Sequence, residues 1–191
     1  SLIVLGGGYI GCELAQMFSR AGAKVTIVCR SRLLPDAEPE ISAALTEYLT
    51  DEGLQICAGV AYQGITETDD GVMLSVTAGG EQRDIVAEHV MLATGRAPNA
   101  QGLGLADAGV AVTASGGIEV DDRLRSSNPS IYAAGDVTGR DMFVYMAAYG
   151  ARLAVENALN GNSRVYDASA MPAVVFTDPQ VASVGLTEAA A

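Results

Sequence analysis

The sequence predicts an α/β fold that begins with a parallel sheet. An apolar run at residues 2–5 leads directly into a glycine-rich turn, which is followed by a helical pattern and a second short β-branched run at 24–29. That order is typical of a βαβ unit, whose strands pair in parallel. Alternating segments with turn signals between them then predict an antiparallel meander, and the apolar run at 90–93 predicts a closing strand.

The glycine-rich turn is the most informative local feature. Gly6, Gly8 and Gly11 fit the pattern G-x-G-x-x-G between a strand and a helix. One glycine permits the tight turn, one lets the backbone approach a phosphate, and one lets helix and strand pack closely. Unpaired N–H groups at the helix start face such a ligand. We therefore predict a Rossmann-like dinucleotide-binding domain, the alternative being a plain strand-to-helix turn in a chain with 22 glycines.

The other elements of the first part follow from periodicity. The first helix is predicted to end at Gly22, and the second spans 36–52, before Gly53. Strands are predicted at 54–58 and, in the meander, at 60–67, 72–78 and 82–87. The apolar positions at helical spacing are predicted to form the buried helix faces. They are Leu14, Met17, Phe18 and Ala21 on the first helix, and Ile41, Ala44, Leu45, Tyr48 and Leu49 on the second.

The end of the second strand carries arginines where a carboxylate is common. An Asp or Glu about 20 residues past the glycines usually holds a free ribose hydroxyl. Here Arg30 and Arg32 occupy that region, which has no carboxylate before Asp36. Guanidinium groups can pair with a 2'-phosphate, which favours NADPH over NADH. The alternative is two solvated arginines at a strand end.

Composition excludes several classes of function. The net charge of −12 disfavours binding to nucleic acid or to an anionic membrane, and no apolar run approaches the length of a membrane span. Cys12, Cys29 and Cys57 show neither disulfide nor metal spacing, which suits a reducing cytoplasm. We expect buried structural thiols and no metal site. Cys12 is the exception to watch, because a helix start can lower a thiol pKa.

The second part of the chain begins with a Gly/Pro-rich crossing at 94–99 that reads as a linker. Strands are predicted at 117–121 and 130–134, a helix at about 143–160 and a further strand from 173. The strand at 130–134 ends in Gly135 and Asp136. A carboxylate at the carboxyl end of a buried strand can accept hydrogen bonds from ligand hydroxyls. The alternative is an aspartate that caps the next turn.

Three segments in this order resemble the signatures of the FAD-dependent pyridine nucleotide-disulfide oxidoreductases. They are residues 2–13 (LIVLGGGYIGCE), 93–99 (ATGRAPN) and 131–136 (IYAAGD). The resemblance implies an NADPH-binding domain at 1–93, a C-terminal segment of an FAD-binding domain at 94–168, and the start of a dimer-interface domain at 169–191. Residues 143–145 and 171–185 resemble the members that reduce mercuric ion, whereas those that act on disulfides usually have His in place of Asp178.

The resemblance also implies roles for individual residues. Gly6, Gly8 and Gly11 would contact the NADPH pyrophosphate, and Tyr9 would cover the nicotinamide pocket and move aside. Glu13 resembles a carboxylate near the flavin, and Gly95 a glycine near the nicotinamide. On the FAD side, Gly135 precedes Asp136, which corresponds to the residue that binds the ribityl chain, while the backbone of Phe143 and Val144 would approach the flavin ring.

Parts of the family pattern have no counterpart here. The sequence has one glycine fingerprint rather than two, and no C-x-x-x-x-C redox pair. We therefore expect an internal, by itself inactive, fragment of a homodimeric flavoenzyme that uses NADPH and FAD to reduce mercuric ion. One alternative is a disulfide reductase of the same family, such as dihydrolipoamide dehydrogenase or glutathione reductase. The other is a dinucleotide-binding module without chemistry.

Overall fold

A computed structural model describes all 191 residues and confirms the α/β fold class. The chain forms two compact units. The first combines Ser1–Gly95 with Pro172–Ala191, and the second is Arg96–Met171. No helix is long and apolar enough to cross a membrane. Residues 172–191 thus belong to the same unit as the N-terminal part of the chain.

The core of the first unit is a four-stranded parallel sheet with the order β3-β2-β1-β7. Its elements are β1 (Leu2–Leu5), β2 (Val25–Val28), β3 (Gln55–Cys57) and β7 (His89–Leu92), with helices α1 (Tyr9–Arg20) and α2 (Pro39–Asp51). The predicted β-α-β-α-β order with a closing strand is therefore confirmed. Parallel pairing requires the helical crossovers that the sequence pattern indicated.

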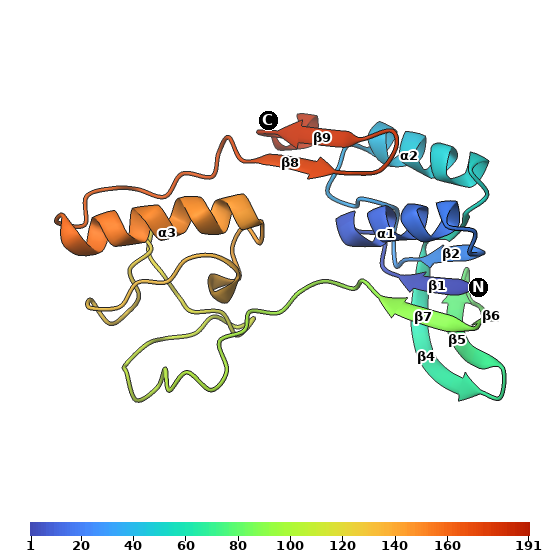
Figure 1. The fold of residues 1–191 in the computed structure, drawn as a ribbon, viewed down its shortest axis with the longest axis horizontal. Coiled ribbons are helices and arrows are strands. Elements are labelled where there is room, and N and C mark those ends of the chain that lie inside the picture. Colours follow the sequence, from blue (N-terminus) through green and yellow to red (C-terminus); the bar gives the residue numbers. More distant parts are fainter. The chain divides into compact units, whose positions relative to one another are not determined.

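The predicted meander is also confirmed, as an antiparallel sheet of β4 (Val60–Thr68), β5 (Gly71–Ala78) and β6 (Glu81–Ala87). It lies on one face of the parallel sheet, and α1 and α2 lie on the other (Figure 1). Alternation along β1 separates the two cores, because Ile3 and Leu5 pack toward the meander while Val4 packs toward the helices.

The buried faces of the helices differ from the prediction. On α1 the buried residues are Gly11, Cys12, Ala15 and Gln16, whereas Met17 and Phe18 are exposed. Small side chains face the sheet because α1 starts at the glycine turn, where its backbone passes close to β1. On α2, Ser42 joins Leu45 and Leu49 in the core, while Ile41 and Tyr48 are exposed. The prediction is therefore confirmed for Leu45 and Leu49 and wrong for the other long apolar residues named here, which lie on the surface.

The hairpin of β8 (Pro172–Val175) and β9 (Val181–Val184) completes the first unit and is followed by a short 3-10 helix, η2 (Glu188–Ala190). Val175 is buried in the helix-side core. Gln16 binds the backbone on both sides of Asp178: its Nε2 donates to Asp178 O (2.8 Å) and its Oε1 accepts from Asp178 N (2.8 Å). The Arg20 guanidinium pairs with the Asp178 carboxylate at 2.9 Å.

The second unit is mostly irregular, with α3 (Val144–Leu159) and a 3-10 helix, η1 (Asp136–Thr138). The predicted helix is confirmed, but the predicted strands at 117–121 and 130–134 are wrong. Only isolated bridges form there: Val112 with Ile118, Val120 with Ser126, and Arg125 with Tyr132. These segments turn back every few residues, and their N–H groups bond to nearby loops instead of a continuous partner strand.

Candidate functional site

The glycine turn has the geometry that a phosphate-binding loop needs. Gly6 has φ +118°, and a Cβ there would lie 2.3 Å from Ala93 O. At Gly11 a Cβ would lie 2.1 Å from Gly6 O, so only glycine allows α1 to approach the turn this closely. A Cβ on Gly8 meets nothing within 4 Å. The turn therefore has no space for a side chain at Gly6 or Gly11, whereas the space beside Gly8 is open.

Gly8 is also the N-cap of α1. No side chain caps this helix end. The first turn of an α-helix presents N–H groups that have no intrahelical acceptor, together with the positive end of the helix dipole. An uncapped start beside an open glycine is thus suited to an anionic group.

Two predicted site residues in the first turns of α1, Tyr9 and Glu13, have their side chains in contact with other parts of the first unit. Tyr9 is half-buried and packs against the helix-side core. Glu13 Oε1 accepts a hydrogen bond of 2.8 Å from Phe176 N, just after β8. Glu13 therefore connects α1 to the hairpin, a contact between residues far apart in the sequence that their spacing could not reveal.

Arg30 and Arg32 have different surroundings. Arg30 is exposed at the end of β2, whereas Arg32 is half-buried. Arg32 Nη2 donates to the backbone oxygens of Pro35 (2.9 Å) and Ala37 (2.8 Å). One arginine is thus directed to solvent, and the other holds the loop that leads into α2.

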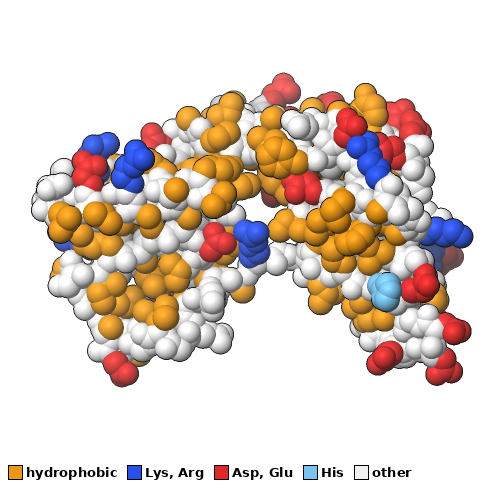
Figure 2. Space-filling view, in the orientation of Figure 1, with side chains coloured by type: hydrophobic (Ala, Val, Ile, Leu, Met, Phe, Trp, Pro, Cys, Tyr) orange, Lys and Arg blue, Asp and Glu red, His pale blue; other side chains and the backbone are white.

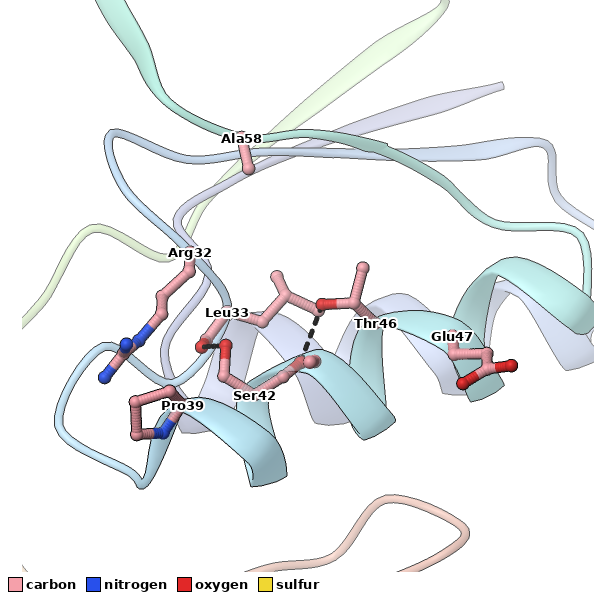
Figure 3. A pocket seen from close by; sticks show the side chains of 8 residues that line it. Arg32, Leu33, Pro39, Ser42, Thr46, Glu47 and Ala58 are labelled. Carbon is pink, nitrogen blue, oxygen red and sulfur yellow. Dashed lines mark hydrogen bonds between the residues drawn. The ribbon is translucent and has the colours of Figure 1, made fainter.

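Arg32 also borders an open groove of about 530 Å³ beside α2 (Figure 3). Ala58 lies across the groove from the helix, which contributes Ser42 and Thr46. Ser42 Oγ donates to Leu33 O (2.5 Å), and Thr46 Oγ1 donates to Ser42 O (2.8 Å). The hydroxyl groups of this groove therefore serve the local backbone.

The cysteines are free thiols, and Cys12 and Cys29 are buried beneath the glycine turn. Cys12 Sγ lies 3.6 Å from Gly7 O, and a Cβ on Gly7 would lie 3.1 Å from Cys29 Sγ. Burial raises the pKa of Cys12 to about 12 and also raises that of Cys29. The expected influence of the helix start on Cys12 is thus outweighed by desolvation. No group of three or more His, Cys, Asp or Glu side chains is placed to hold a metal ion.

The second unit brings together the other predicted site residues. Gly135 (φ +80°) packs against Ala147 of α3, since a Cβ there would lie 2.9 Å from the Ala147 Cβ. Asp136 begins η1. Arg96 Nη1 lies 3.4 Å from Asp136 Oδ2 and 3.3 Å from Met142 O, and so joins η1 to the loop before α3. Arg96 is not among the predicted site residues, although it follows Gly95 in the second signature segment.

The start of α3 resembles that of α1. Phe143 is the N-cap, and no side chain caps the helix. Phe143 N donates to Asp141 O (2.6 Å), so this N–H is used within the loop, while Val144 is 84% exposed. Apolar side chains also reach the surface along α3 and along α1 (Figure 2). Gly95, with φ +119°, ends the stretch 1–95 of the first unit.

The predicted residues therefore form two groups. The group in the first unit is Gly6, Gly8, Tyr9, Gly11, Glu13, Arg30, Arg32 and Gly95, and the group in the second unit is Gly135, Asp136, Phe143 and Val144. The first group includes the start of α1 and the second includes the start of α3, and no side chain caps either helix.

The chain is similar in sequence to mercuric reductases and to a dihydrolipoyl dehydrogenase. Mercuric reductases from Streptomyces lividans and Bacillus cereus are 43% and 44% identical over 98% of this chain, which spans 40% and 30% of their lengths. Dihydrolipoyl dehydrogenase from Geobacillus stearothermophilus is 39% identical over 98% of the chain and 40% of its own length.

Solved structures of flavoprotein reductases and related proteins superpose on almost the whole chain. LpdA from Mycobacterium tuberculosis superposes with a TM-score of 0.88 at 30% identity, covering 98% of this chain and 40% of LpdA. The flavoprotein disulfide reductase RclA from Escherichia coli gives 0.86 at 33% identity, covering 99% and 43%. The family model described as pyridine nucleotide-disulphide oxidoreductase matches residues 1–153. This chain belongs to the pyridine nucleotide-disulphide oxidoreductase family.

Proposed function

We propose that this chain supplies the NADPH site and part of the FAD site of a longer flavoenzyme that reduces mercuric ion to elemental mercury. The observation that carries the proposal is the glycine turn. It has no space for a side chain at Gly6 or Gly11, and it is open at Gly8, beside a helix start that no side chain caps. The relatives support the substrate, since the mercuric reductases are up to 44% identical and the dihydrolipoyl dehydrogenase is 39% identical.

The residues of the first unit fit NADPH. Gly8 and the start of α1 would hold the pyrophosphate, and the exposed Arg30 would pair with the 2'-phosphate. Arg32 contributes by holding the loop at 33–37 in place. Tyr9 would cover the nicotinamide pocket, and its packing against the core sets the position from which it moves.

The residues of the second unit fit FAD. The half-exposed carboxylate of Asp136, next to Gly135, would accept hydrogen bonds from ribityl hydroxyls, and the start of α3 at Phe143 and Val144 would face the ring. When bound, NADPH supplies a hydride and FAD accepts it and passes electrons onward. The protein residues bind and orient these groups, and none of them contacts mercury. Cys12, Cys29 and Cys57 lack the spacing of the redox pair, which we place elsewhere in the enzyme.

We further propose a cytoplasmic homodimer. The three cysteines are all free thiols, as expected in a reducing compartment. On the hairpin segment, Phe176 is 70%, Val184 64% and Leu186 77% exposed, which supplies apolar surface for a subunit interface.

The test is a substrate comparison with the full-length, FAD-loaded enzyme. NADPH oxidation would be followed with mercuric chloride in excess thiol, with lipoamide and with glutathione disulfide, and mercury vapour would be measured separately. We expect NADPH-dependent release of mercury and little activity on either disulfide. Preferential turnover of lipoamide or glutathione disulfide would establish the disulfide reductase alternative. A full-length protein that binds NADPH but cannot be loaded with FAD, and turns over none of the three substrates, would establish the binding module.

A further inference from the structure

The loop that leads into α3 has an unusual backbone. Gly139 has φ +75° and Asp141 has φ +40°. Phe143 N then donates to Asp141 O across only two residues (2.6 Å). A non-glycine residue in the left-handed region is unfavourable unless its surroundings hold it there. The loop therefore needs an external support, and its conformation decides how α3 begins.

That support is Tyr166, from the segment that follows α3. Tyr166 Oη donates to Asp141 Oδ2 at 3.0 Å. The Arg140 guanidinium lies 5.2 Å from the centre of the Tyr166 ring, within the range of a cation–π contact. Two consecutive residues of the loop thus contact one tyrosine, the first through its ring and the second through its hydroxyl.

Tyr166 is itself fixed on several sides. Its backbone N donates to Asp122 O at 2.7 Å, and its ring centre lies 5.3 Å from that of Tyr149 on α3. Gly150 of α3 lies beside the ring, since a Cβ there would be in van der Waals contact with Tyr166 Cε2 at 3.5 Å. Burial and the hydrogen bond to Asp141 raise the pKa of Tyr166 to about 12. Tyr166 is thus held in place by its own contacts, and it in turn contacts Arg140 and Asp141 of the loop.

We propose that Tyr166 is a positioning residue for the flavin end of this enzyme: its bond to Asp141 sets the loop at 139–143 and, through it, the direction of the first turn of α3. This inference rests on the proposed FAD site at that helix start. Tyr166 acts through Asp141 and does not contact the cofactor.

The test uses the full-length enzyme with four variants, one of which is a control. Tyr166→Phe removes the hydroxyl and keeps the ring, and Asp141→Ala removes the acceptor. Asp141→Asn keeps an oxygen acceptor and is the conservative rescue. Tyr132→Phe is the matched control, because Tyr132 packs in the same small core as Tyr166 and its hydroxyl makes no hydrogen bond. The measurements are the Kd of FAD, the midpoint potential and absorption spectrum of bound FAD, and hydrogen exchange of the Phe143 amide in the apoprotein.

We expect Tyr166→Phe and Asp141→Ala to weaken FAD binding about tenfold, the usual scale for a hydrogen bond to a charged group. Both should shift the flavin spectrum and potential and speed exchange at Phe143, whereas Asp141→Asn and Tyr132→Phe should stay near wild type. Unchanged flavin properties in Tyr166→Phe, with or without a lower melting temperature, would overturn this inference alone. A wild-type enzyme that binds no FAD would overturn the proposed function and this inference with it.

Discussion

Alanine at Gly8 and alanine at Gly11 should have opposite consequences, although both glycines belong to the same turn. At Gly11 the added Cβ would lie 2.1 Å from the carbonyl oxygen of Gly6. Both partners are backbone, so no rotamer change relieves the overlap and α1 must move away from β1. Overpacking of this kind costs about 3 kcal/mol or more.

At Gly8 the protein has room. Its φ of −81° is open to any residue, and a Cβ there meets nothing within 4 Å. Alanine is a slightly poorer N-cap than glycine, but it reduces the entropy of the unfolded chain by about 0.4–1 kcal/mol. These effects offset each other, and stability should change by less than about 1 kcal/mol. A methyl group at this helix start would nevertheless occupy space that the proposed pyrophosphate site needs.

The assay is thermal unfolding combined with NADPH titration of the full-length enzyme. A change of 1 kcal/mol moves the melting temperature by about 2–4 °C for 150–250 residues and by less for a longer chain, so Gly11→Ala should lower that of the full-length enzyme measurably, by at most about 6–12 °C. Gly8→Ala should melt within about 4 °C of wild type and bind NADPH at least about tenfold more weakly, a loss of about 1.4 kcal/mol. Wild-type NADPH affinity in Gly8→Ala, or an unshifted melting temperature in Gly11→Ala, would refute the reasoning.

Three further predictions concern other parts of the first unit. Arg30→Ala should weaken NADPH binding and leave NADH binding unchanged, whereas Arg32→Ala should weaken both by loosening its loop; equal losses of NADPH selectivity in the two variants would contradict this division. Gln16→Ala should lower stability by about 1–3 kcal/mol and speed proteolysis within 172–191, because both polar groups of its side chain bind the hairpin backbone at Asp178. The pKa of Cys12 is raised from its ordinary value of 9.0 to about 12 in the folded state. Its contribution to the free energy of unfolding is therefore fully present below pH 9 and is lost as the pH rises toward about 12. Unfolding of Cys12→Ala should accordingly depend less on pH between 9 and 12 than that of wild type, and identical profiles would exclude the effect.

Local sequence determined most of the first unit. Strand and helix order in 1–93 could be predicted because the glycine turn, the β-branched runs and the turn signals act over neighbouring residues. The glycine at position 11 could be given a packing role for the same reason. The faces of α1 could not be predicted from spacing alone, since periodicity identifies an apolar stripe but not which stripe meets the sheet. Close backbone approach selected Cys12 and Ala15 for the core instead of Met17 and Phe18.

Tertiary structure decided what depends on residues far apart in the chain. Residues 172–191 return to the first unit, where Val175 is buried in the core and the backbone of the segment bonds to Glu13 and Gln16 of α1. These contacts span more than 150 positions and leave no local pattern in the sequence. The apolar runs at 117–121 and 130–134 looked like strands, yet a strand requires a partner of matching length and register, and only single bridges form. Residue types and short-range spacing thus determined the glycine turn, because its conformation depends on the backbone of adjacent glycines. The support of the α3 start by Tyr166 depends on a partner 25 positions away, and only the folded chain brings its hydroxyl to Asp141.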